Sequence, residues 1–183
     1  MLKPGKVITK KNNQKKRILI LSANSDIGLK VTNIFLQNNW NVTAHYNSQN
    51  VNTKKLNILK KQNNAIELFQ FDFLEINKFE KYVIKNKFFF QQFDAFVSLT
   101  GFNNLKNFSD SNINNINQHI NVNYYSNILI IKELLKNMKK KKWGRILLTS
   151  SIGTKFGGSE NSYAYSLSKF MNEFFPNHYK NYF

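Results

Sequence analysis

A tyrosine and a lysine four residues apart are the side chains of this 183-residue chain best suited to chemistry. They are Tyr165 and Lys169, in the segment YSLSK. Residues four apart on a helix share one face, so the phenol and the ammonium can meet in one site. A phenol ionises near ~10, but a nearby ammonium favours the phenolate and so suits proton exchange with a substrate oxygen. Taken alone, this spacing more often marks a structural surface pair.

Polar side chains upstream strengthen the catalytic interpretation. The segment GRILLTSSIG places Ser150 and Ser151 at the end of an expected buried strand. A hydroxyl there could hydrogen-bond a carbonyl oxygen while Tyr165 protonates it. The segment NVNYY places Asn123 within an expected long helix, where an unsatisfied amide would be costly. Asn123 therefore indicates a buried polar network.

Short apolar runs alternate along the chain with segments of helical periodicity. We expect strands at 17–22, 41–46, 65–71, 93–100 and 145–151, and helices at 26–38, 51–61, 74–87, 109–138 and 163–175. Strands separated by helices imply parallel βαβ units, hence a sheet covered on both faces. Ligands of such sheets bind at the carboxyl ends of the strands, which would bring Ser22, Thr100, Gly101 and Ser151 into one crevice.

The segment SANSDIG, residues 22–28, lies between the first expected strand and the first expected helix. This is where dinucleotide phosphates bind in many enzymes, usually on a glycine-rich turn. Here only Gly28 is a glycine, and Asp26 adds a carboxylate. We interpret Asp26 mainly as the N-cap of the helix. The helix that follows carries an apolar stripe of Ile27, Val31, Ile34 and Phe35.

In order and spacing, these motifs resemble those of the short-chain dehydrogenase/reductase family from about Arg17 onward. The matching segments are ILSANSDIG, FDF at 71–73, SLTG at 98–101, NVNYY, GRILLTSS and YSLSK. The resemblance implies an α/β, Rossmann-like, doubly wound parallel sheet of about five strands in the order 3-2-1-4-5. It also implies reversible hydride transfer between a nicotinamide cofactor and a carbonyl/alcohol substrate.

The resemblance implies a role for each catalytic residue. Tyr165 would be the acid/base, and Lys169 would stabilise its phenolate and bond the nicotinamide ribose. Ser151 would orient the substrate oxygen, and Asn123 would hold a water that links Lys169 to solvent. Asp72 would bond the adenine amino group, with Phe73 supplying a backbone contact. The implied cofactor-binding residues are Ser22, Ser25, Asp26, Ile27, Gly28, Asp72, Phe73, Thr100, Gly101, Tyr165 and Lys169.

The sequence departs from the family pattern at three places. Ser22 and Asp26 occupy two of the three glycine positions of the turn, and SLTG replaces Asn-Asn-Ala-Gly. The chain also stops at Phe183, whereas family members continue with two more strands and a segment that covers the substrate. We therefore expect a tail at 1–16 and one NAD(P)-binding domain at 17–183 that lacks the usual last strands. A truncated, non-catalytic dinucleotide-binding or interaction module is the alternative function.

Cofactor choice and partners are indicated more indirectly. The segment after the second strand, AHYNSQN, has no carboxylate, and Lys54 and Lys55 follow it, which favours NADP over NAD. By the resemblance, the helices that carry Asn123 and Tyr165 would form a homodimer.

Composition limits the other classes of protein. The formal net charge of +17 is compatible with binding nucleic acid, but no recognition motif accompanies it, so we interpret the lysines as a solvated surface. There is no Cys, and the three His residues lie far apart, so we expect no metal site. No apolar run is long enough for a membrane span and the N-terminus does not resemble a secretory signal, so we expect a cytoplasmic protein.

Overall fold

The computed structural model describes residues 15–176 and residue 179 of the chain. Within this part, five parallel strands form one sheet in the order β3-β2-β1-β4-β5. The predicted α/β, Rossmann-like sheet and its strand order are therefore confirmed. The predicted tail at 1–16 lies outside the described residues except for Lys15 and Lys16.

The observed elements follow the predicted alternation. The strands are β1 (Arg17–Leu21), β2 (Asn41–Tyr46), β3 (Ile66–Gln70), β4 (Ala95–Ser98) and β5 (Arg145–Leu148). The α-helices are α1 (Asp26–Gln37), α2 (Val51–Gln62), α3 (Ile76–Lys85), α4 (Lys87–Gln91), α5 (Ile113–Ile120), α6 (Ser126–Lys141) and α7 (Tyr163–Met171). Three shorter turns complete the described chain: η1 (Phe108–Asp110), η2 (Asn121–Tyr125) and η3 (Ile152–Lys155).

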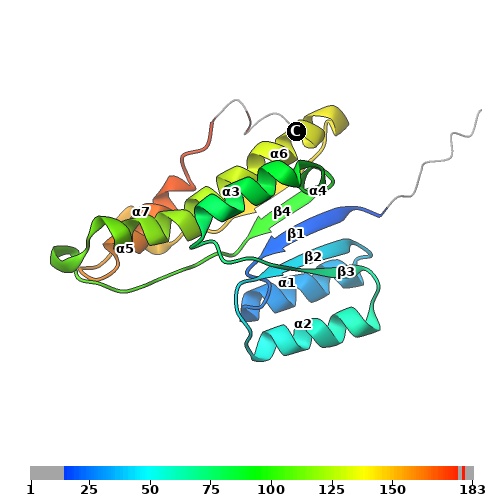
Figure 1. The fold of residues 1–183 in the computed structure, drawn as a ribbon, viewed down its shortest axis with the longest axis horizontal. Coiled ribbons are helices and arrows are strands. Elements are labelled where there is room, and N and C mark those ends of the chain that lie inside the picture. Colours follow the sequence, from blue (N-terminus) through cyan, green and yellow to red (C-terminus); the bar gives the residue numbers. More distant parts are fainter. Residues whose placement is uncertain (1–14, 177–178, 180–183) are drawn as a thin grey trace, which may run out of the picture.

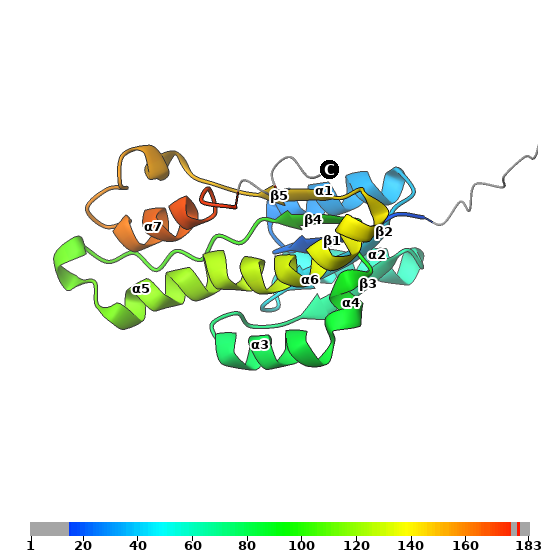
Figure 2. The same cartoon turned by 90° about the horizontal axis from the view of Figure 1, so that it is seen from above.

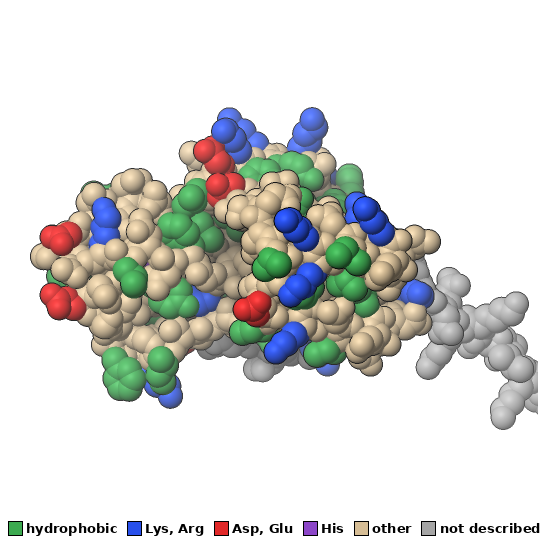
Figure 3. Space-filling model, turned by 90° about the horizontal axis from the view of Figure 1, so that it is seen from below, with side chains coloured by type: hydrophobic (Ala, Val, Ile, Leu, Met, Phe, Trp, Pro, Cys, Tyr) green, Lys and Arg blue, Asp and Glu red, His purple; other side chains and the backbone are tan. Residues whose placement is uncertain are grey.

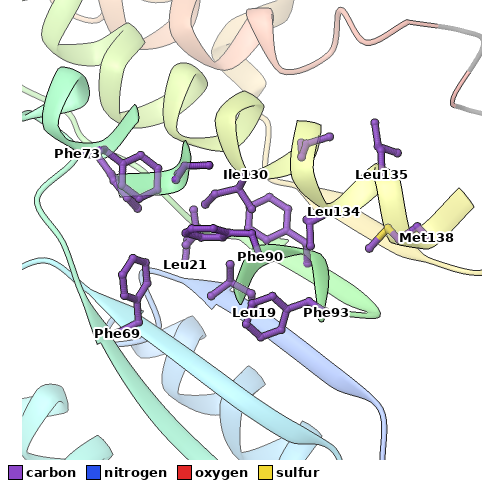
Figure 4. Packing of buried hydrophobic residues seen from close by; sticks show 14 residues of the cluster. Leu19, Leu21, Phe69, Phe73, Phe90, Phe93, Ile130, Leu134, Leu135 and Met138 are labelled. Atoms are coloured by element: carbon purple, nitrogen blue, oxygen red, sulfur yellow. The ribbon is translucent and has the colours of Figure 1, made fainter. Parts of the chain in front are cut away.

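Helices cover both faces of the sheet, α1 and α2 on one face and α3, α4 and α6 on the other (Figures 1 and 2). Alternate residues of a strand point to opposite faces. Accordingly, Ile18 and Ile20 of β1 pack in the cluster with α1 and α2, whereas Leu19 and Leu21 join the larger cluster on the other face. In that larger cluster, phenylalanines such as Phe90 and Phe93 interlock with aliphatic side chains of α6 (Figure 4).

Helix α1 packs through only part of its predicted apolar stripe: Val31 and Phe35 pack against the core on this face of the sheet. Ile27 and Ile34 are mostly exposed, whereas Gly28 and Thr32 are buried. A Cβ on Gly28 would clash with the carbonyl oxygen of Ser22, so the helix approaches the preceding turn closely enough to require glycine. This close approach rotates the small residues inward and part of the aliphatic stripe outward.

The region 109–138, predicted to be largely helical, forms three consecutive helical segments from Ile113 onward. α5 and α6 are joined by η2, a single π-helical turn that contains Asn123. Together they form a long rod, and α7 packs beside the end that holds α5 (Figures 1 and 2). This end projects beyond the carboxyl ends of the strands, so α5, η2 and α7 border the region where ligands of such sheets bind.

Strand β5 is half-exposed, and the prediction that it is a buried strand reaching Ser151 was wrong. It pairs with β4 alone among the described strands, and Leu147 on it is largely exposed. The strand also ends at Leu148, so Ser150 and Ser151 lie on the connection that follows it. As the sequence predicted, β5 is the edge of the sheet.

The described part of the chain contains no membrane helix, and on the face formed by α1 and α2 its basic side chains do not gather into one patch. In the described part of the chain, no helix combines the length and the apolar character needed to cross a bilayer. Seen from the side of α1 and α2, Lys and Arg side chains are scattered among other residue types (Figure 3). The same view shows the surface hollowed between the body of the sheet and the projecting end that holds α5 and α7.

Candidate active site at the carboxyl ends of the strands

Lys169 is a buried cation at the carboxyl end of the sheet. Its side chain is 2% exposed, and its Nζ donates to the carbonyl oxygen of Thr100 at 2.7 Å and to Oγ1 of Thr149 at 2.9 Å. These acceptors follow β4 and β5, so Lys169 ties α7 to the ends of two adjacent strands. Both acceptors are neutral, and burial lowers the pKa of Lys169 to about 8.

Tyr165 shares the site with Lys169, as the spacing predicted. Both residues belong to α7, and the Lys169 Nζ lies 6.0 Å from the centre of the Tyr165 ring. Tyr165 is half-buried, so its phenol is more accessible than the ammonium behind it. This arrangement places the phenol of Tyr165 outward and the ammonium of Lys169 inward.

Ser151 lies two residues beyond Thr149, at the start of η3. Its Oγ accepts a hydrogen bond from the amide of Gly153 at 3.2 Å, and the side chain is half-buried. The neighbouring Ser150 hydroxyl donates to the carboxylate of Glu173, as does the hydroxyl of Thr154 at 2.9 Å. Glu173 therefore fastens the connection on both sides of Ser151.

Asn123 is fully buried and bonds two segments of the site. Its side-chain Oδ1 accepts from the amide of Phe102 at 2.8 Å, and its Nδ2 donates to the carbonyl of Phe102 and to Oγ of Ser168, each at 2.9 Å. Phe102 follows β4 and Ser168 lies on α7. The polar network that the sequence indicated is thus present, and the role of Asn123 in holding a water stays a prediction.

The turn at 22–28 places the N-terminus of α1 at the end of β1. Ser25, not Asp26, is the N-cap: its Oγ accepts from the Gly28 amide at 3.0 Å. The prediction for Asp26 was wrong because the helix begins at Asp26 itself, one residue earlier than a cap at Asp26 requires. Asp26 is the first helical residue, and its Oδ1 accepts from Nδ2 of Asn52 on α2 at 2.8 Å.

The same turn retains features that suit a phosphate. The amides of Asp26 and Ile27 have no acceptor within the described part of the chain, as is usual for the first turn of a helix. Ser22 adopts the left-handed conformation that glycine favours, with φ of 54°. The exposed carboxylate of Asp26 is the one feature that opposes an anion here.

The residues predicted to contact the rest of a dinucleotide lie along the same edge of the sheet. Asp72 follows β3, and its Oδ1 accepts from the amide of Leu74 at 2.9 Å. Phe73 is buried and stacks on His45, with the ring centres 4.3 Å apart. Thr100 and Gly101 follow β4, and a Cβ added to Gly101 would meet only the carbonyl oxygen of Leu99, at an ordinary contact distance of 3.9 Å. A flat group could therefore approach the backbone at Gly101.

Two residues of this edge were missed at the sequence level. His45 accepts from the Ser22 amide at 3.3 Å through Nδ1, and its Nε2 lies 2.9 Å from the Phe71 carbonyl, so it joins the turn to the ends of β2 and β3. Thr149, which binds Lys169, directly follows β5 in LLTSS. The position of Thr149 directly after an expected parallel strand could have predicted it as a site residue. His45, a single histidine within a strand, showed no pattern that could have predicted its role.

The fold and site define a dinucleotide-binding type of α/β sheet with a Tyr–Lys pair at its carboxyl edge. A family model described as short chain dehydrogenase matches residues 16–179. The chain therefore belongs to the short-chain dehydrogenase/reductase family, whose members are NAD(P)-dependent oxidoreductases. No curated protein matches the sequence significantly.

Solved structures agree on the fold. ElxO with NADP bound is 24% identical, with a TM-score of 0.69 over 86% of this chain and 63% of that chain. Acetoin dehydrogenase from Enterobacter cloacae is 17% identical, with a TM-score of 0.74 over 87% and 64%. A short-chain dehydrogenase from Streptomyces avermitilis is 16% identical, with a TM-score of 0.73 over 87% and 58%. The chain thus spans about three fifths of the length of these structural relatives.

Proposed function

We propose that this protein is an NADP-dependent oxidoreductase that transfers a hydride between the nicotinamide and a carbonyl/alcohol substrate. The observation that carries the proposal is the buried ammonium of Lys169, held beside Tyr165 by the ends of β4 and β5. Burying a cation without a carboxylate partner is costly for the fold. A tyrosine and a lysine that only pack together on a helix surface would not need a buried ammonium. A phenol that exchanges protons benefits from one, because the ammonium favours the phenolate.

The bound nicotinamide would supply the hydride chemistry, and the chain's own residues would manage the proton. In reduction, Tyr165 would donate its phenolic proton to the substrate oxygen, and in oxidation its phenolate would accept the alcohol proton. Lys169 would stabilise the phenolate and bond the ribose, while the Ser151 hydroxyl would orient the substrate oxygen. Asn123 would hold the water that connects Lys169 with solvent.

The cofactor-binding edge supports a dinucleotide and favours NADP. The free amides at the start of α1 suit the diphosphate, the exposed backbone at Gly101 suits a flat ring, and Asp72, which follows β3, would bond the adenine amino group. Residues 47–50 after β2 are exposed and contain no carboxylate, so they present no charge against a 2′-phosphate. Lys54 and Lys55 are exposed on α2 close by.

A non-catalytic dinucleotide-binding module is the second candidate. The observation that favours it is the exposed Asp26 carboxylate at the phosphate turn, which would weaken anion binding. For either function we propose a homodimer, assembled through the α5–α6 rod and α7. Light scattering of the eluting protein would measure its mass and contradict this if only a 21.5 kDa species appeared.

Cofactor titration followed by turnover tests the proposal. We expect NADPH fluorescence to change on binding, with weaker binding of NADH, and no response to either at millimolar concentration would exclude the function. With acetoin, cyclohexanone and a 3-oxoacyl thioester as carbonyl probes, Tyr165→Phe should abolish the turnover that the wild type shows. Tyr163→Phe on the same helix is the matched control. Cofactor binding without turnover of any probe, unchanged by Tyr165→Phe, would favour the non-catalytic module.

A further inference from the structure

The carbonyl oxygen of Asn123 is the meeting point of two buried side-chain amides. Nδ2 of Asn127 and Nδ2 of Asn172 each donate to it at 2.8 Å. The Asn127 Nδ2 also donates to Oδ1 of Asn172 at 3.2 Å, so the three residues form a closed group. All three are at least nine-tenths buried, and the cluster connects η2, α6 and the end of α7.

This group lies on the same side of α7 as the site. Asn172 is three residues beyond Lys169 and four beyond Ser168, so the three positions share a helix face. Ser168 receives the Nδ2 of Asn123, and its own hydroxyl donates to the carbonyl of Tyr165 at 2.7 Å. Asn123 therefore contacts α7 twice, by its side chain at Ser168 and by its backbone at Asn172.

The hydrogen bonds of Lys169, Asn123 and Asn172 form a closed chain that begins and ends on α7. Lys169 on α7 binds the Thr100 carbonyl, Thr100 is two residues from Phe102, and Phe102 is paired with Asn123. Asn123 then returns to α7 through Asn172. Shifting α7 along η2 would strain the two buried bonds that α7 makes, from Lys169 to Thr100 and from Asn172 to Asn123.

We propose that Asn127 and Asn172 are positioning residues that hold α7 in register with η2 and thereby fix Lys169, beside Tyr165, against its acceptors Thr100 and Thr149. The proposal rests on the proposed function, which gives Tyr165 and Lys169 their roles. Asn172 is the more important of the two, because it links α7 directly to η2, whereas Asn127 belongs to α6, which continues from η2. Small displacements of reacting groups cost rate, so this register matters for turnover.

The test compares Asn172→Leu, similar in size but without polar atoms, with Asn172→Gln, which retains the amide donor. In cofactor-free protein labelled with 13C at lysine, NMR titration follows Lys169, assigned by its loss in Lys169→Arg. We expect the Lys169 pKa to rise from about 8 towards its ordinary value in Asn172→Leu, because a loosened α7 admits water. In Asn172→Gln the Lys169 pKa should lie between the wild-type value and that of Asn172→Leu. In the exposed control Asn117→Ala it should equal the wild-type value.

Turnover provides the second measurement. With NADPH and a carbonyl probe that the wild type reduces, Asn172→Leu should lower kcat about tenfold or more with little change in KM for NADPH, and should displace the pH profile of kcat.

The proposal would be overturned if Asn172→Leu showed the wild-type titration of Lys169 and the wild-type pH profile of kcat. If Asn172→Leu does not fold, Asn127→Val decides by the same criteria, with a smaller shift expected in the same direction. Failure of the wild type to bind cofactor would remove the proposed function, while the Lys169 titration would still decide the register.

Discussion

The ammonium of Lys169 donates to the backbone carbonyl of Thr100 across 2.7 Å, in a place where the lysine is almost fully buried. A backbone carbonyl does not neutralise the charge. The folded protein therefore carries a cation at a cost, and it carries it next to a half-buried phenol. This relationship distinguishes the site from an ordinary helix surface and leads to a prediction about pH.

Lys169→Met should change how stability depends on pH. The pKa of Lys169 is lowered to about 8 by burial, so the unfolded chain binds this proton more tightly than the folded one. The penalty is fully present below pH 8 and is relieved as the pH rises towards about 10.4. Relative to Lys169→Met, the wild type should gain about 3 kcal/mol over that window.

Urea unfolding at several pH values between 7 and 10.5 measures this difference. Lys132→Met on the exposed side of α6 serves as the control and should show no such pH dependence. A constant stability difference between wild type and Lys169→Met across the window would mean that Lys169 is not a buried cation.

Ser22→Gly should stabilise the protein. Ser22 has φ of 54°, a left-handed conformation that costs a residue with a Cβ about 1 kcal/mol and costs glycine little. We expect a gain of about 0.5–1 kcal/mol in the free energy of unfolding and tighter NADPH binding at the turn. Ser111→Gly, at φ of −71°, should be neutral or destabilising. A loss of stability in Ser22→Gly would show that the serine is not strained.

The parallel sheet followed from the alternation of strands and helices, and the order of its strands followed from the resemblance to the family. The packing of α1 did not, since Gly28 and Thr32 turn inward for a close approach that hydrophobicity does not reveal. The cap at Ser25 was missed for a related reason: three of the four residues at 23–26 are polar, and only the backbone decides which one caps.

The Tyr165–Lys169 pair could be predicted because helix geometry alone brings residues four apart together. The partners of Lys169 could not, because Thr100 and Thr149 reach it from separate strands. The π-helical turn at Asn123 leaves no periodic signature in NVNYY, so the clustering of Asn127 and Asn172 on its carbonyl appears only in the folded chain.

His45→Phe should remove an acid-sensitive element of the fold. His45 is fully buried, and desolvation lowers its pKa to about 4 although the bond to Phe71 opposes this. The neutral form is thus favoured by folding, and its contribution is complete above about pH 6.5 and is lost as the pH falls towards 4. The wild type should lose about 3 kcal/mol over this range relative to His45→Phe, which retains a ring against Phe73.

Thermal unfolding at pH 7, 6, 5 and 4 distinguishes this effect from general acid destabilisation, which both proteins share. NADPH binding to the folded wild type should weaken only as the pH approaches about 4, where the ring takes up its proton and can no longer accept from the Ser22 amide. Parallel pH profiles of the two proteins would contradict the assignment of His45 as the titrating group.

Glu173→Ala should impair turnover through Ser151 without touching the cofactor edge. The Glu173 carboxylate accepts from the hydroxyls of Ser150 and Thr154, on both sides of Ser151, and these bonds lower the pKa of Glu173. Its hold on the connection is present above the ordinary carboxyl pKa and is lost as the pH falls through the lowered one. We expect kcat to fall about fivefold to tenfold while NADPH affinity is retained.

Two variants serve as controls. Glu173→Gln, which keeps one acceptor oxygen, should lower kcat less, and Glu160→Ala, which removes an exposed carboxylate from the same connection, should leave kcat unchanged. Steady-state kinetics at pH 7, with limited proteolysis of the connection as a second measure of its order, checks all three variants. Equal kinetics for Glu173→Ala and Glu160→Ala would show that the orientation of Ser151 does not depend on Glu173.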